Sequence, residues 1–272
     1  MSATVLPIPR RAGRAVGRLR RCAIGLLPLA GVLAILIPWW LATGPLFGPS
    51  PMAAQFSPAA TWGAAVRLLV SGELWPHTGA SLRRVAVGLA AALAVGVPLG
   101  LLVGVSRGFE RATSLSFQFL RMVSPLSWMP LAVMVLGIGD APVHFLLAFA
   151  AVWPIVLNVA AGVAAIDPRW LRLARSLSAG RRETLFGIIV PAILGHLLTG
   201  LRLAIGLIWI VLVPAEMLGV QAGLGYYILD ARDRLAYGEL LAVILYIGLL
   251  GYLLDHGARA LHRRWRRRGA SV

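Results

Sequence analysis

The sequence predicts an all-α polytopic membrane protein with about six transmembrane helices, and three observations support this prediction. Of the 272 residues, 59% are hydrophobic and only 13% are charged. This composition excludes a disordered chain and is unusual for a soluble domain. Several apolar runs reach the roughly 20 residues that a helix needs to cross a bilayer. Basic residues gather at the ends of these runs, where they would meet water or lipid headgroups.

The distribution of the 26 basic residues, all of them arginine, predicts the orientation. With six spans and both termini in the cytoplasm, 19 arginines lie in inner segments and 5 in outer segments. Cytoplasmic loops carry such an excess of positive charge in multi-pass proteins. Although the net charge is +16, no compact basic region remains to hold phosphates, so we expect a lipid bilayer around the chain and no nucleic-acid partner.

The N-terminal third begins with a basic tail, residues 1–21, followed by a first transmembrane helix over 22–43. A signal peptide also pairs a basic region with an apolar one, but no clear small-x-small cleavage site follows. Residues 44–79 form an extracytoplasmic segment in which Ser57 and Pro58 predict the start of a helix on the outer membrane surface.

The second predicted span, residues 81–105, has a small residue at every fourth position. Such ladders let another helix approach closely, because lipid supplies no hydrophobic drive for association. Its outer end carries Arg83 and Arg84 against the charge bias, and three interpretations stay open: snorkelling, acidic partners or attraction of an anion. The ladder consists of Gly88, Ala92, Gly96, Gly100 and Gly104.

The remaining spans follow in order. We predict a third span over 113–136, a fourth over 143–165, a fifth over 194–217 and a sixth over 239–258. An outer loop over 218–238 contains a short helix, and residues 261–272 form a basic cytoplasmic tail.

Residues 167–191 connect the fourth and fifth predicted spans on the cytoplasmic side. Asp167 suits a helix cap and Pro168 the first helical position. A second helix should start near Arg182, with Pro191 breaking or kinking it. The apolar face of the first helix would rest on the membrane surface or in a groove of a soluble partner, and periodicity leaves both open. That face consists of Trp170, Leu173, Ala174 and Leu177.

The same stretch resembles the EAA loop of permease subunits from bacterial ABC importers. The E-A-A positions are Arg172, Leu173 and Ala174, the glycine position is Ser178, and Pro191 ends the I-x-L-P element. Of these motif positions, only Ala174, Ile188 and Pro191 match by identity. Four further segments resemble the nitrate, sulfonate, taurine and bicarbonate group of these permeases: GIGDAP at 137–142, WPIVLN at 153–158, TGLRLAIGLIWI at 199–210, and AEMLG at 215–219 with GLGYYILDAR at 223–232.

The resemblance implies a type I ABC importer transmembrane domain over residues 80–260 in the bacterial cytoplasmic membrane. It also implies two ATPase subunits, an extracytoplasmic substrate-binding protein and a second permease subunit, in a homodimer or a heterodimer. The chain has no lysine for a P-loop, no enzymatic motif and only Cys22 for thiolate chemistry, so we expect no catalysis, cofactor or metal site. The implied ATPase contacts are Trp170, Arg172, Leu173, Ala174, Leu177, Ser178 and Pro191.

Four polar residues inside predicted spans are candidates for the translocation path: Arg121, Asn158, Arg202 and Glu216. The arginines would attract an anion or snorkel to the inner interface. Asn158 would touch substrate or bond another helix. Glu216 would gate the path or satisfy backbone donors freed by a break after Pro214.

The function that follows is import of a small anion driven by the ATPase partner. An ion-gradient-driven secondary transporter is a second hypothesis, but it would need a relay of intramembrane carboxylates, and Glu216 is nearly alone. Two further hypotheses are a permease of the same class for a non-anionic solute and a membrane scaffold without transport.

Overall fold

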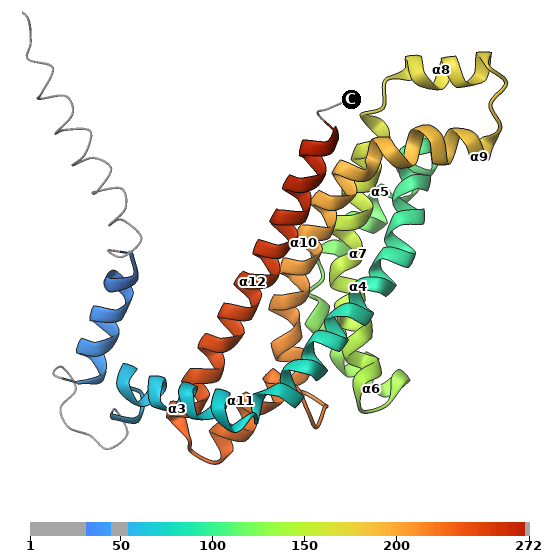
Figure 1. The fold of residues 1–272 in the computed structure, drawn as a ribbon. Helices are drawn as coiled ribbons and strands as arrows, with labels where there is room; N and C mark the ends of the chain where they lie inside the picture. Colours follow the sequence, from blue (N-terminus) through green and yellow to red (C-terminus); the bar gives the residue numbers. More distant parts are fainter. Residues whose placement is uncertain (1–30, 45–53, 270–272) are drawn as a thin grey trace, which may run out of the picture. The chain divides into compact units, whose positions relative to one another are not determined.

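The protein is described by a computed structural model that covers residues 31–44 and 54–269, and these residues form helices and turns without a strand (Figure 1). The chain divides into two units, Met1–Ala64 and Ala65–Val272. In the first, the helix Gly31–Thr43 covers the second half of the predicted first span, and the rest of that span lies outside the described residues. Within this unit the Trp39 indole donates a hydrogen bond of 2.9 Å to the carbonyl of Phe56.

Four helices in the described part of the chain are long and apolar enough to cross a membrane. They are Leu74–Val105, Asp140–Ala164, Arg182–Glu216 and Tyr237–Ala260, and they match the predicted second, fourth, fifth and sixth spans. The first of these, α4, begins at Leu74 rather than at residue 81. Pro76 lies in its first turn, where a missing N–H is tolerated, so the helix extends through the boundary expected at residue 79.

Helix α7 (Asp140–Ala164) is the centre of the second unit and packs against α4 and α10 (Val190–Glu216). Its residues Leu147, Ile155 and Val159 are fully buried. The glycines of the α4 ladder face it: an added Cβ at Gly88, Gly96, Gly100 or Gly104 would come within 2.5–2.9 Å of α7 side-chain atoms. The prediction that the ladder packs against a helix is confirmed, and that helix belongs to the same chain.

The third span is not the single helix that we predicted over 113–136. Helix α5 (Arg107–Met122) ends, and a short 3-10 turn, η1 (Pro125–Trp128), leads into α6 (Met129–Leu136) at an angle of 89°. The cause is local, because a residue before proline is driven out of the helical region. Ser124 accordingly has φ −59° and ψ 130°, and Pro125 lacks the N–H that would continue α5.

The stretch over 167–191 folds as α8 (Pro168–Ser176) and α9 (Arg181–Thr184), which leads through a π-helical segment, η2 (Leu185–Ile189), into α10. The loop over 218–238 contains α11 (Leu224–Asp233), which confirms the short helix predicted there. Helix α12 (Tyr237–Gly269) continues past its predicted end at 258. In Figure 1, α8, α9 and the end of α12 lie at one end of the bundle, and α6 and α11 lie at the other. Helix α3 (Pro58–Ser71) confirms the helix start predicted at Ser57 and Pro58.

Candidate functional site

Helix α8 is held at both ends by its own chain. The Asp167 carboxylate accepts a hydrogen bond of 2.8 Å from the N–H of Arg169 and caps the first turn. At the other end, the N–H of Ala179 bonds the carbonyl of Ala174, and the N–H of Ser178 bonds that of Arg175. This pair of bonds is a Schellman motif, which needs a left-handed residue directly after the cap. Ser178, at the glycine position of the EAA pattern, supplies it with φ +54°.

The apolar face of α8 is exposed. Trp170, Leu173 and Leu177 are 59%, 51% and 73% exposed. Ala174, which the sequence places on the same face, is buried at 4%. Three large apolar side chains on a short capped helix therefore lie open at the end of the bundle opposite to α11.

Pro191 does not break the helix that leads back into the bundle. Instead, the backbone widens just before it, and the N–H of Val190 bonds the carbonyl of Leu185, five residues earlier. A π-turn of this kind accommodates a residue whose N–H is missing, and such turns are frequent at functional sites. The chain from Arg182 to Glu216 thus stays one continuous helix that links the α8 end of the molecule to the α11 end.

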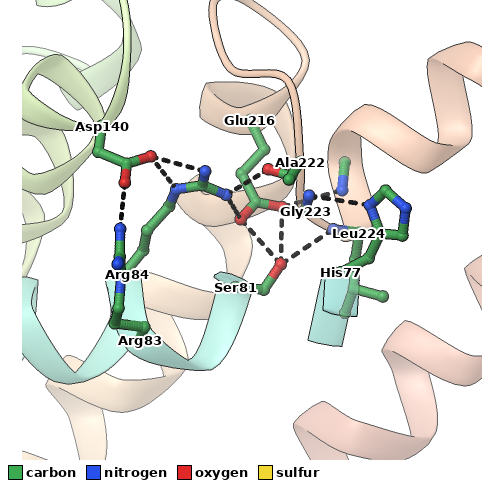
Figure 2. A network of polar contacts seen from close by, with 10 residues as sticks. His77, Ser81, Arg83, Arg84, Asp140, Glu216, Ala222, Gly223 and Leu224 are labelled. Atoms are coloured by element: carbon green, nitrogen blue, oxygen red, sulfur yellow. Dashed lines mark hydrogen bonds and ion pairs between the residues drawn. The ribbon is translucent and has the colours of Figure 1, made fainter. Parts of the chain in front are cut away.

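A buried network of polar groups joins four helices at the α11 end (Figure 2). The carboxylate of Glu216, fully buried at the end of α10, accepts hydrogen bonds of 2.7 Å from Arg84 Nη1 and 2.8 Å from Ser81 Oγ. It also accepts a bond of 2.9 Å from the N–H of Gly225. Arg84 reaches in the other direction to Asp140 Oδ1, at 2.8 Å from Nε and 2.6 Å from Nη2. The arginine is 4% exposed, and its pair with Glu216 is shielded from solvent on both sides, whereas the Asp140 side chain of the other pair is 31% exposed.

The loop before α11 supplies backbone groups to the same network. The N–H of Leu224 donates to Ser81 Oγ at 2.9 Å, and the N–H of Gly223 donates to His77 Nδ1 at 3.1 Å. Arg84 also donates to the carbonyl of Ala222. Gly223 has φ +134°, and a Cβ there would lie 2.5 Å from the Glu216 carboxyl carbon. The glycine is therefore required both by its backbone conformation and by the approach of the loop to the carboxylate.

The structure places the four candidates for the translocation path in different environments. Glu216 belongs to the buried network and satisfies the N–H of Gly225 at the start of α11, not a donor of a broken α10. Arg202 Nε bonds Asp255 Oδ1 of α12 at 3.0 Å, so its charge is paired. Asn158 Nδ2 bonds the carbonyl of Pro154, one turn earlier in its own helix, at 2.8 Å. Arg121 lines a cavity of about 410 Å³ between α4, α5 and α7.

A second set of charges lies around the α11 helix and the start of α12. Arg234 pairs with Asp230 at 2.7 Å and with Glu239 at 3.3 Å, and its guanidinium lies 5.7 Å from the centroid of the Tyr227 ring. Burial raises the pKa of the Tyr227 hydroxyl, and the pKa of Arg234 is raised, first by that hydroxyl and then by Asp230. Within the part of the chain that the structure describes, Arg232 pairs only with the neighbouring Asp233, and both are well exposed.

Comparison with known proteins assigns a family to this architecture. The family described as binding-protein-dependent transport system inner membrane component matches residues 96–267, which is more than half of the chain. The chain belongs to this family. The bicarbonate transport system permease protein CmpB of Synechococcus elongatus is 36% identical to it, over 88% of each chain. The taurine transport system permease protein TauC of Escherichia coli is 35% identical, over 86% of each chain.

A solved structure supports the fold of this permease. A chain of the MetNI methionine ABC transporter, in inward-facing conformations, superposes with a TM-score of 0.58 at 19% identity. The match covers 76% of the present chain and 98% of the other. The resemblance to the type I importer fold and to the nitrate, sulfonate, taurine and bicarbonate group is therefore confirmed, and the permease is an all-α, multi-pass inner-membrane component.

The buried network of the permease is the part that sequence reasoning missed. Arg83 and Arg84 stood out against the charge bias, and the structure selects acidic partners from the three interpretations. Arg83 adds a bond of 2.5 Å to Asp140 Oδ2. Ser81 and His77 carried no signal, because nothing in a linear pattern indicates that a serine will face a loop 143 residues later.

Proposed function

We propose that this permease forms the translocation path of an ATP-driven ABC importer for a small oxyanion and couples to a separate ATPase through α8. Its partners are two ATPase subunits, a second permease subunit and an extracytoplasmic substrate-binding protein. The termini lie in the cytoplasm, in line with the arginine distribution. The anion class is proposed by analogy with relatives such as CmpB and TauC, named for bicarbonate and taurine transport.

The exposed face of α8 is the observation that supports this proposal most strongly. Trp170, Leu173 and Leu177 occupy successive turns of one helix, and each is more than half exposed. Spaced apolar anchors on a short helix are the pattern by which a helix seats in a groove of a partner. The capped ends hold the helix in shape before it binds, which reduces the entropy that docking would otherwise cost.

The coupling proposal is tested by Leu173→Asp in the full importer. Burying a leucine side chain is worth roughly 1.5–3 kcal/mol, and burying an unpaired carboxylate in its place costs more. The variant should insert into the membrane normally but release the ATPase during purification of the complex through a tag on the permease.

Arg175→Ala is the matched control, since Arg175 is exposed on the opposite face of the same helix and is not among the implied ATPase contacts. This control variant should keep the ATPase. If α8 instead rests on lipid, Leu173→Asp will co-purify with as much ATPase as Arg175→Ala does, and ATP-driven uptake will survive.

A further inference from the structure

The broken third span carries a polar stripe along its whole first half. In α5 the residues Arg107, Glu110, Ser114, Gln118 and Arg121 recur at three- and four-residue intervals, so they share one face of the helix. The other side carries Leu115 and Phe119, which are 78% and 68% exposed. Polar residues within membrane helices face a bundle interior or an aqueous cavity. The stripe of α5 therefore marks a water-accessible side of this helix.

The cavity of about 410 Å³ lies on that side. Glu110, Ser114, Gln118 and Arg121 line it from α5, Gly104 lines it from α4, and Trp153 lines it from α7. Its length follows the helix: from Glu110 to Arg121 the axis rises roughly 16 Å, about half the thickness of a bilayer core. Figure 1 shows α5 on the α8 side of the bundle and α6 at the opposite end. The Arg121 end of the cavity thus reaches the middle of the bundle, at the point where the span breaks.

Two hydrogen-bond donors at the Arg121 end of the cavity have no partner within the described residues. The Trp153 indole Nε1 is buried and makes no hydrogen bond, although the ring itself is fixed by Phe117 and Phe149 at centroid distances of 5.6 and 5.7 Å. Among the described residues, Arg121 takes part in no ion pair or hydrogen bond, in contrast to Arg202, which has Asp255. The Arg121 side chain is exposed and therefore open to a ligand in the cavity. The Trp153 N–H is buried, and a buried donor that finds no partner in its own protein points to a ligand or solvent that satisfies it.

We propose that the Arg121 end of this cavity is an oxyanion-binding site on the translocation path, with the Arg121 guanidinium and the Trp153 indole N–H as its donors. An oxyanion offers several acceptor oxygens, and guanidinium suits such ligands because its N–H groups lie in one plane. The cavity carboxylate, Glu110, lies eleven residues away, too far to contact the same small ion. The site at a break between helix segments agrees with the way transporters build midplane sites. This inference rests on the proposed anion importer.

The test measures anion access directly and does not require the substrate to be known. Cys22 is the only cysteine of this chain, so in a Cys22→Ser background Gln118→Cys is the one thiol of the permease and reports on the cavity one turn from Arg121. The importer in liposomes is treated with an anionic methanethiosulfonate, the sulfonatoethyl reagent, and with its cationic trimethylammonium analogue. A unit charge one helical turn away should change the ratio of the two rates by about fivefold or more.

We expect Arg121→Gln to lower the anionic-to-cationic rate ratio by that amount, Arg121→Lys to preserve it, and Arg202→Gln, a paired arginine outside the cavity, to leave it unchanged. An unchanged ratio in Arg121→Gln overturns the site, and so does failure of both reagents to reach Gln118→Cys. Because this readout does not involve transport, it remains interpretable if the importer carries none of the anions offered, a result that would overturn the proposed function instead.

The indole donor has its own matched pair of variants. Trp128→Phe and Trp153→Phe each remove a buried, unpartnered N–H from a ring packed on Phe149, but only Trp153 lines the cavity. In uptake of labelled nitrate, bicarbonate or taurine, Trp153→Phe should lower the rate about tenfold, the usual effect of losing a hydrogen bond to a charged group. Trp128→Phe should stay near the unmodified importer. Equal losses in the two variants would mean a packing effect and overturn the role of the indole.

Discussion

Removing Glu216 tests the buried network most severely. The carboxylate is fully buried and accepts from Arg84, Ser81 and Gly225. Arg84 is 4% exposed, and in Glu216→Ala its guanidinium would keep Asp140 as its remaining acidic partner. Breaking a buried ion pair on one side costs about 3–5 kcal/mol. At 2–4 °C per kcal/mol for a protein of this size, the midpoint of thermal unfolding should fall by roughly 6–20 °C.

The assay is thermal unfolding of the detergent-purified importer, read as the fraction that stays soluble and monodisperse. Asp230→Ala is the control: it also removes an acid from an arginine pair, but the side chains of Arg234 and Asp230 are 47% and 38% exposed and lie outside the spans. Exposed pairs contribute at most about 1 kcal/mol, so its midpoint should shift by only a few degrees.

A second variant separates the charge from the packing. Arg84→Met combined with Glu216→Leu removes both buried charges, and such replacements are often neutral or stabilising. The double variant should therefore be more stable than Glu216→Ala, even though Ser81 and Gly225 lose an acceptor. If Glu216→Ala shifts the midpoint no more than Asp230→Ala, the network does not stabilise the α11 end and the reasoning fails.

Three further predictions concern packing, the coupling loop and the outer loop. Gly96→Leu should lower the yield of folded complex, because even a Cβ would come within 2.9 Å of Ile155, whereas Gly206→Leu, with nothing within 4 Å, should not. Ser178→Gly should relieve left-handed backbone strain and slow hydrogen exchange of α8 amides about fivefold; faster exchange would contradict it. Arg232→Glu should weaken stimulation of the ATPase by the loaded binding protein in a salt-dependent manner, while equal stimulation at all salt concentrations would exclude this docking surface. Arg234 is unsuitable because its pairs with Asp230 and Glu239 join α11 to α12, whereas Arg232 pairs with its exposed neighbour Asp233.

Local chemistry explains the parts of the fold that the sequence predicted. Asp167 as a cap and Pro168 as the first helical residue correctly predicted where α8 begins. Small residues at every fourth position of α4 correctly indicated that another helix packs closely against it. The broken third span was missed although Pro125 was visible. Prolines occur within membrane helices, and a proline alone does not distinguish a kink from an 89° turn.

The polar network could not be predicted because its members are far apart in the chain. Ser81 and Glu216 are separated by 135 residues, and Arg84 and Asp140 by 56. A sequence shows that intramembrane charges need partners, but which acid meets which arginine depends on the register of α4, α7 and α10. The two intramembrane arginines illustrate this: Arg202 is paired by α12 and Arg121 has no ion pair among the described residues, although they looked equivalent in sequence.

ATP-driven uptake by the reconstituted importer tests the central claim most directly. The permease, its ATPase and the binding protein are assembled in liposomes, with the ATP-accessible side controlled, and uptake of labelled nitrate, bicarbonate and taurine is measured with and without ionophores. We predict uptake of at least one of these solutes that requires ATP and the binding protein, is lost in Leu173→Asp, and persists when ion gradients are dissipated. Uptake that continues without ATP and stops when ion gradients are dissipated would contradict the account and identify a secondary transporter.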